Sequence, residues 1–163
     1  MPVFERFWTI FRELVEQPFI SPGMIWGIEP LYFGWFLNEL SPGKANFRTA
    51  IQTGFTLIWA SAQWLYRSGV THVSFSALHV VNTAVSFVVM GMGLLALISG
   101  VMRKFPRYCS FLGHTRFSGY FMIMMFPIQA GLLGWTWDRL AAIFIFAIPT
   151  WAVISFGFMP LRK

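Results

Sequence analysis

Charged residues are scarce in this sequence. Only 11% of its 163 residues are Asp, Glu, Lys or Arg, whereas an ordinary soluble domain contains about 25%. Hydrophobic residues make up 56% of the chain, aromatic residues make up 19%, and the mean hydropathy is +0.62. So few charges cannot cover the surface of a soluble domain, and a chain with so much apolar surface does not stay disordered. The composition therefore predicts an integral membrane protein.

Cysteine and acidic residues are also few. Cys109 is the single cysteine, so an intramolecular disulfide is excluded. It follows a basic segment beside a predicted helix end, where S-palmitoylation can occur, but a free thiol is the expected state. The sequence contains 6 acidic and 12 basic residues, which gives a net charge of +6. In a membrane protein such an excess belongs mainly to cytoplasmic loops, so no nucleic-acid partner is expected.

Residues 1–17 are predicted to form an amphipathic helix. Apolar residues recur at spacings of three and four between Val3 and Val15, and charged residues fill the gaps. Pro18 is expected to end the helix. The segment is too polar to cross a membrane, and its polar face carries both signs of charge. It therefore fits docking onto protein as well as onto lipid headgroups.

Residues 22–40 form a hydrophobic segment that is poorly suited to spanning a membrane. The segment is long enough to cross, but Glu29 and Pro30 stand at its centre and three glycines weaken its helix propensity. A carboxylate at the middle of a bilayer costs about 2.5–3.5 kcal/mol on insertion scales. We therefore predict a re-entrant, interfacial or broken element.

Four further segments are expected to span the membrane: 49–66, 80–102, 118–136 and 140–160. Each contains almost no charge and is close to the roughly 20 residues that a spanning helix needs. The predicted fold is an all-α integral membrane protein with one domain, residues 1–163. In it the amphipathic helix and the broken segment precede a four-transmembrane-helix bundle.

The basic residues predict the orientation of this bundle. With four spans, ten basic residues fall on one side and only Arg67 and Arg139 fall on the other. A fifth span at 22–40 would change the division to eight and four. The positive-inside rule favours four spans with both termini on the cytoplasmic side, in a bacterial inner membrane or an organellar inner membrane.

Polar residues recur on one face of each of two consecutive spans. Gln52, Thr56 and Gln63 fall within about 40° of one another on a helix. Asn82 and Ser86 share a narrow face of the next span with two glycines. Consecutive spans are antiparallel neighbours, so we expect the two faces to meet and to support helix packing. A polar ligand or ion path is the alternative.

Glu29 is the acidic candidate within a hydrophobic segment. A carboxylate in such a place points to proton or cation coupling. The other interpretations place Glu29 at headgroup level beside Pro30, or pair it with a basic residue of a partner chain.

Three histidines raise the question of a haem site. In the predicted topology His72 and His79 lie near the outer surface and His114 lies near the inner one. The hydrocarbon core separates the two surfaces by about 30 Å, so His79 and His114 cannot ligate one haem. Ligation of a haem or chlorin by a single histidine, shared with another subunit, stays open. No metal-binding or catalytic motif is present, so no metal ligand and no catalytic residue are predicted, and an enzyme is not favoured.

The segment 103–117 interleaves basic and aromatic residues. This pattern suits contact with anionic lipid headgroups or with an acidic partner surface. Charges that only set the topology explain it as well. The basic residues concerned are Arg103, Lys104, Arg107 and Arg116.

These features predict a non-catalytic accessory or scaffold subunit of a larger multi-subunit membrane complex. The short loops leave no room for an extramembrane domain, and many bulky side chains are available to pack against other membrane subunits and lipid. The alternative is a small homo-oligomeric proton- or cation-coupled transporter or channel. That protein would use Glu29 together with the face of Gln52, Thr56 and Gln63.

Overall fold

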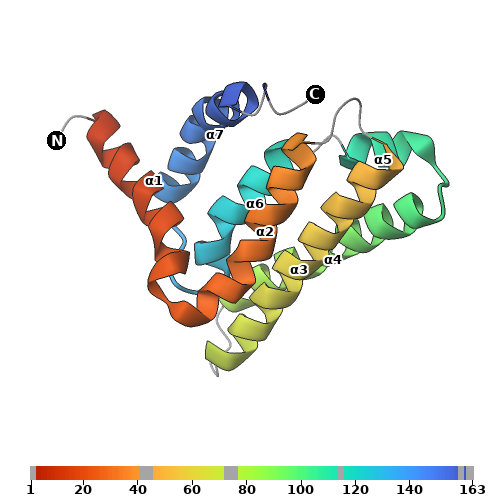
Figure 1. Cartoon of the computed structure of the whole chain (residues 1–163). Coiled ribbons are helices and arrows are strands. Elements are labelled where there is room, and N and C mark those ends of the chain that lie inside the picture. Colours follow the sequence, from red (N-terminus) through yellow and green to blue (C-terminus); the bar gives the residue numbers. More distant parts are fainter. Residues whose placement is uncertain (1–2, 41–45, 72–76, 114–115, 158–159, 161–163) are drawn as a thin grey trace.

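The computed structural model describes residues 3–40, 46–71, 77–113, 116–157 and 160. These residues form seven helices and no strand, which confirms the all-helical fold class. In chain order the helices are α1 (Val3–Ile20), α2 (Pro22–Leu40), α3 (Phe47–Thr71), α4 (Ala77–Val101), α5 (Pro106–Gly113), α6 (Arg116–Gln129) and α7 (Trp137–Gly157). Figure 1 shows α1 and α2 as a V-shaped hairpin, whose open end faces the same way as the last turns of α7.

Helix α2 runs antiparallel to α3 along most of its length. A Cβ atom on Gly27 would lie 3.4 Å from Gln63 Oε1, and one on Gly34 would collide with the Thr56 side chain. Because Gly27 and Gly34 are seven residues apart, they lie on the same face of α2 and let the two backbones approach closely. Asn38 Nδ2 extends the contact by donating to Thr53 Oγ1 at 3.3 Å.

Helix α4 packs on the other side of α3. A Cβ atom on Gly93 would lie 2.9 Å from the backbone nitrogen of Ile58 and 3.0 Å from the carbonyl oxygen of Gly54. A Cβ atom on Gly54 would in turn lie 2.6 Å from the backbone nitrogen of Leu97. The α3–α4 interface is therefore a backbone-to-backbone contact that leaves no space for larger side chains.

The core lies between α2, α3 and α6, and α1 and α7 close its remaining side (Figure 1). Its largest fully buried side chains are apolar or aromatic, among them Leu14, Ile28, Trp64, Phe126 and Ile143. The outward faces of α4 and α7 are apolar as well but exposed, as in Phe87, Leu95, Phe144, Ile148 and Val153.

Two of the described helices are long and apolar enough to cross a membrane. They are Val80–Val101 within α4 and Trp137–Ile154 within α7, and 22% of each is buried inside the structure. These helices cover the predicted spans 80–102 and 140–160. The other two predicted spans are less clear, because α3 is long but less apolar, and α6 has only 14 residues.

Residues 118–136 were predicted to form one spanning segment, but in the structure they do not form one continuous helix. Helix α6 ends at Gln129, and Gly131 has a left-handed backbone with φ of 76°. The amide of Leu132 donates to the Pro127 carbonyl at 2.9 Å, and the amide of Gly131 donates to the Ile128 carbonyl at 3.1 Å. This is the Schellman motif, in which glycine ends a helix and its last carbonyls accept bonds from the following turn.

Two other predicted helix breaks are absent from the structure. Helix α1 continues through Pro18 to Ile20, and α2 is continuous through Pro30, so residues 22–40 are not a broken element. A proline within a helix removes one amide donor and strains the preceding turn. In α2 Pro30 deprives the Trp26 carbonyl of its helical donor, and on the next residue the indole Nε1 of Trp59 donates to the Gly27 carbonyl at 3.0 Å. In addition, the predicted loop 103–117 contains the helix α5.

The α3–α4 contact predicts a sharp difference between two glycines of one helix. Gly93→Ala must push α4 away from the α3 backbone, and overpacking of this kind costs about 1–3 kcal/mol. Gly91→Ala is the matched control, because a Cβ atom there has nothing within 4 Å. Thermal unfolding of the purified protein in detergent should show a lower Tm for Gly93→Ala and an unchanged or higher Tm for Gly91→Ala. Equal Tm values for the two variants would contradict the packing described.

Candidate functional site

The outward face of α2 lines a groove. Glu29, Tyr32, Phe33 and Phe36 follow one another at spacings of three and four, so they share this face. Together with Trp35, Glu39 and Ile154 they line a groove of about 530 Å³. Ile154 belongs to α7, so the groove is bounded by α2 and by the C-terminal part of α7. This volume falls within the range of about 300–1,000 Å³ that is common for small-molecule sites.

Glu29 differs from Glu13 and Glu16 on the neighbouring helix α1. Its side chain is exposed and has no hydrogen-bond or ion-pair partner among the described residues. On α1, by contrast, Glu13 and Glu16 both face an arginine within ion-pair distance. At the other end of the groove the side chain of Glu39 is buried, with 1% exposure. Glu29 is therefore exposed, but the surface of the groove itself is almost wholly apolar, so the carboxylate lies at its margin.

The structure does not bring Glu29 to the polar face of α3. Two residues along a helix correspond to a rotation of about 200°, so Glu29 lies on the side of α2 opposite to Gly27. It is the Gly27 and Gly34 side of α2 that covers Gln63 and Thr56. Thr56 also donates its hydroxyl to the Thr53 carbonyl at 2.8 Å. Gln52, half-buried, completes this stripe on α3.

Of the two faces predicted to meet, the one on α4 does reach α3 through its glycines Gly93 and Gly100, but the polar stripe of α3 is turned to another neighbour. The stripe of Thr56 and Gln63 faces α2, whereas α4 packs against the side of α3 that carries Gly54. On α4, Asn82 Oδ1 accepts a hydrogen bond from Trp135 Nε1 at 2.6 Å, and Ser86 Oγ donates to the Asn82 carbonyl at 2.9 Å. These polar side chains of α4 thus bond to the segment after α6 and to their own helix.

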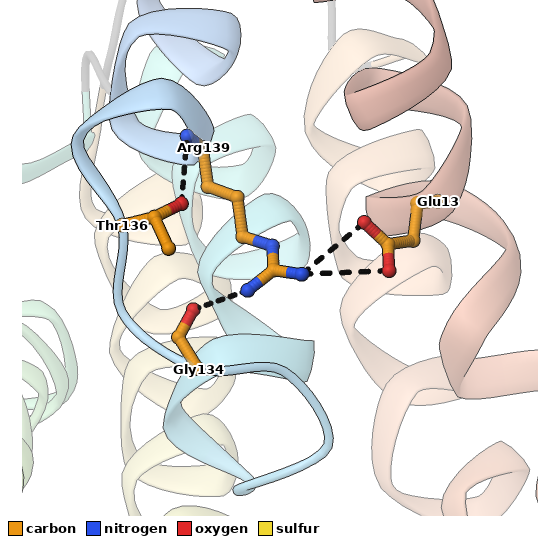
Figure 2. A network of polar contacts seen from close by, with 4 residues as sticks. All are labelled: Glu13, Gly134, Thr136 and Arg139. Atoms are coloured by element: carbon orange, nitrogen blue, oxygen red, sulfur yellow. Dashed lines mark hydrogen bonds and ion pairs between the residues drawn. The ribbon is translucent and has the colours of Figure 1, made fainter.

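A network of charges joins α1 to the start of α7. Arg139 Nη2 lies 3.3 Å from Glu13 Oε2, and Nη1 donates to the Gly134 carbonyl at 2.6 Å (Figure 2). The backbone amide of Arg139 also donates to Thr136 Oγ1 at 3.3 Å. About two turns away from Glu13 on α1, Arg6 forms an ion pair with Asp138. The sequence offered no signal for these pairs, because their partners are 126 and 132 residues apart.

Aromatic side chains reinforce the same interface. The ring centroid of Phe146 on α7 lies 4.6 Å from that of Phe11, 5.6 Å from that of Trp8 and 6.1 Å from that of Phe4. Offset and tilted ring pairs at such distances add to the burial of apolar area. The amphipathic helix therefore docks on its own chain along this face.

The basic segment begins where α4 ends. Arg103, Lys104 and Arg107 are exposed there, and Arg103 and Phe105 have left-handed backbones with φ of 50° and 56°. Beside them lies an apolar groove lined by Leu95, Ile98, Ser99, Phe105 and Tyr108. Arg116 begins α6, but its side chain lies outside the described part of the structure.

The predicted haem ligands fall outside the described side chains. His72 and His114 lie outside the described residues, and His79 lies in α4 without a described side chain. Within the described residues no group of three or more His, Cys, Asp or Glu side chains is placed to hold a metal ion.

Comparison with known protein families, with curated proteins and with solved structures finds no match to this chain. The site is therefore interpreted from its own residues and geometry.

The charge network predicts unequal roles for two arginines. Arg139→Gln removes the ion pair to Glu13 and weakens the bond to Gly134, and hydrogen bonds to charged groups contribute about 1.5–3 kcal/mol. Arg12→Gln is the control, because Arg12 and Glu16 form an exposed pair within α1 and such pairs contribute little. Limited proteolysis should cleave α1 faster in Arg139→Gln than in Arg12→Gln. If both variants are cut at the wild-type rate, the network does not hold α1 in place.

Cys109 is predicted to be an unreactive thiol. Its side chain is 1% exposed, its sulfur donates to the Lys104 carbonyl at 3.6 Å, and burial raises the pKa of the thiol. A raised pKa leaves a smaller fraction of thiolate at pH 8, and the thiolate is the reactive form. N-ethylmaleimide should therefore label the folded protein much more slowly than the denatured protein, with the rate rising as the pH increases. Rapid labelling of the folded protein at pH 7 would contradict this prediction.

Proposed function

We propose that this chain is a non-catalytic scaffold subunit of a larger membrane-embedded complex. The observation that supports the proposal best is the apolar surface that its helices leave exposed. Side chains such as Phe87 and Leu95 on α4 are 60% and 63% exposed, and Ile148 and Val153 on α7 are 68% and 73% exposed. Water does not stabilise so large an apolar surface, whereas lipid tails and apolar helices of other subunits do.

Burial supports a membrane rather than a soluble setting. The most apolar helix of a soluble protein normally lies in its core, where most of its residues are buried. In this chain the two most apolar helices are the outer ones, and only 22% of each is buried. The two most apolar helices thus face outward, which is the arrangement expected when lipid is the solvent.

The hairpin of α1 and α2 supports the proposed orientation. Because α2 lies along α3, a membrane that covers α3 also contains α2. Helix α1 then returns toward the open end of the hairpin (Figure 1), so the beginning of α1 and the end of α2 lie toward the same side. We therefore keep the topology proposed from the sequence. It has four crossings by the segments from α3 to α7, and both termini lie on the cytoplasmic side. In this topology α2 is an embedded helix that returns through α1.

The scaffold interpretation is favoured over the transporter alternative by the position of Glu29. That alternative needs Glu29 and the face of Gln52, Thr56 and Gln63 in one path. Glu29 lies on the opposite side of α2 from Gly27, and the glycine face of α2 covers the polar stripe. Polar groups that are covered by a neighbouring helix support packing rather than conduction.

The test is to identify what contacts the outward helices. A photo-reactive residue is placed at Leu95 on α4 or at Ile148 on α7, and the protein is crosslinked in its native membrane. We expect adducts with specific foreign subunits at one or both positions, and the same subunits should copurify at fixed stoichiometry in native mass spectrometry. The matched control position is Ala60, which is fully buried and should give no adduct with another chain. A pure homo-oligomer with lipid adducts alone would overturn the proposal.

A further inference from the structure

The groove where α4 ends and α5 begins has an apolar lining. It has a volume of about 430 Å³ and is lined by Leu95, Ile98, Ser99, Phe105 and Tyr108. Leu95 and Ile98 are 63% and 52% exposed, so the groove opens on the outward face of α4. The rings of Phe105 and Tyr108 lie edge to face with their centroids 6.1 Å apart. The groove therefore accommodates an apolar chain that runs along the end of α4.

Basic side chains border this groove. Lys104 directly precedes Phe105 and Arg107 directly precedes Tyr108, so the α-carbons of each pair are about 3.8 Å apart. Lys104, Arg107 and the neighbouring Arg103 are exposed, and none of them forms an ion pair with another described residue. Positive charge thus lies beside an apolar groove, although it does not line the groove itself.

No acidic residue of the chain offsets this charge. The sequence contains none between Glu39 and Asp138. Glu39 is 1% exposed, and Asp138 is paired with Arg6 on α1. The basic segment therefore attracts an anion that comes from outside the chain.

The fold holds the basic segment against the end of α4. The Lys104 amide donates to the Ser99 carbonyl at 3.3 Å, and its carbonyl accepts a hydrogen bond from the buried Cys109 sulfur at 3.6 Å. Gly100 lies against α3, because a Cβ atom there would be 2.9 Å from the Phe47 carbonyl oxygen. In the proposed topology these bonds keep the bases at the headgroup level of the cytoplasmic surface. From Leu95 to the end of α4 at Val101 is about 9 Å, so the groove extends from that level into the hydrocarbon.

The combination of an apolar groove with a basic border favours an amphiphilic anion. A free phosphate would contact the bases but leave the groove empty. An acidic protein segment would place backbone amides and carbonyls on a lining that offers them few partners, which is unfavourable. A phospholipid has an apolar chain and a negative headgroup at one end, and basic pockets on the cytoplasmic side of spanning helices recognise such headgroups.

We propose that the end of α4 and the turn into α5 bind one anionic phospholipid. An acyl chain lies in the groove over Ile98, and the phosphate group contacts Lys104 and Arg107. This inference rests on the membrane setting of the proposed function, but it needs no partner subunit. It assigns to the subunit a specific lipid in addition to the general contact of its apolar helices with lipid tails.

The experiment uses the full-length protein in a neutral detergent. The protein is titrated with phosphatidylglycerol or with phosphatidylcholine of identical acyl chains, and bound lipid is counted by native mass spectrometry. We expect one phosphatidylglycerol to bind at least tenfold more tightly than phosphatidylcholine. Each basic residue near the headgroup strengthens binding by about fivefold. Lys104→Gln together with Arg107→Gln should therefore weaken phosphatidylglycerol binding at least tenfold and leave phosphatidylcholine binding unchanged.

Two further variants separate the charge from the groove. Arg6→Gln together with Arg12→Gln is the matched control, because it removes the same charge from exposed positions on α1 and should not change lipid binding. Ile98→Trp fills the groove without changing the charge, and it should also weaken phosphatidylglycerol binding. Glycerol phosphate at the same concentration as the lipid should not displace it.

Four results would overturn the proposal. The first is equal affinity of the wild-type protein for phosphatidylglycerol and phosphatidylcholine. The second is unchanged binding after the substitutions at Lys104 and Arg107, with circular dichroism and size-exclusion profiles that show a folded protein. The third is displacement of the lipid by glycerol phosphate, which would show that the phosphate alone is bound. The fourth is that a photo-reactive residue at Ile98 crosslinks in the native membrane to a polypeptide and not to lipid. That result would assign the groove to a partner helix and leave the scaffold proposal standing.

Discussion

The rest of the structure depends on the close approach of two helices to α3. Helix α2 reaches one side of α3 through Gly27 and Gly34, and α4 reaches the other side through Gly93. The contact with α4 is between backbones, and that with α2 is filled by the side chains of Thr56, Gln63 and Phe126, so neither neighbour can rotate without a collision. Arg67 and Trp59 of α3 then donate to the carbonyls of Gly23 and Gly27, at 2.5 and 3.0 Å. These bonds fix the rotation of α2 about its axis.

That rotation determines which side chains face outward. With its glycines turned to α3, α2 must present Glu29, Phe33 and Phe36 on its free side. The groove is thus a consequence of how α2 packs and does not require a separate structural element. In the same way, α4 turns Gly93 and Gly100 inward and leaves larger apolar side chains, including Phe87 and Leu95, exposed.

Local patterns in the sequence predicted the helices well but predicted their neighbours poorly. The spans 80–102 and 140–160 agree with α4 and α7 to within three residues, because long uncharged apolar runs leave few alternatives. The end of α6 was missed, since the signal was a single Gly131 within an apolar run. A break at Pro30, one of the three alternatives expected for residues 22–40, is absent, because α2 is held between α3 and α6 by packing that the sequence does not reveal.

Of the residues that line the groove, the sequence singled out Glu29 alone, and it did not predict how the polar residues are arranged. A carboxylate within a hydrophobic segment singled out Glu29, and a shared helix face singled out Gln52, Thr56 and Gln63. Neither pattern specifies which neighbour a face meets, because that choice is made by steric fit between helices far apart in the chain. The pairs of Arg139 with Glu13 and of Arg6 with Asp138 have the same origin.

The distribution of charge connects the fold to the proposed function. Helix α1 is the most polar of the long helices, and it meets α7 through ion pairs and stacked rings, so much of its charge is neutralised within the chain. The outward surfaces of α4 and α7 are left apolar, and the free side of α2 carries one accessible carboxylate among aromatic rings. The exposed surface of the described helices is therefore apolar over most of α4 and α7, and its charge is concentrated where α1 meets α7 and in the basic segment after α4.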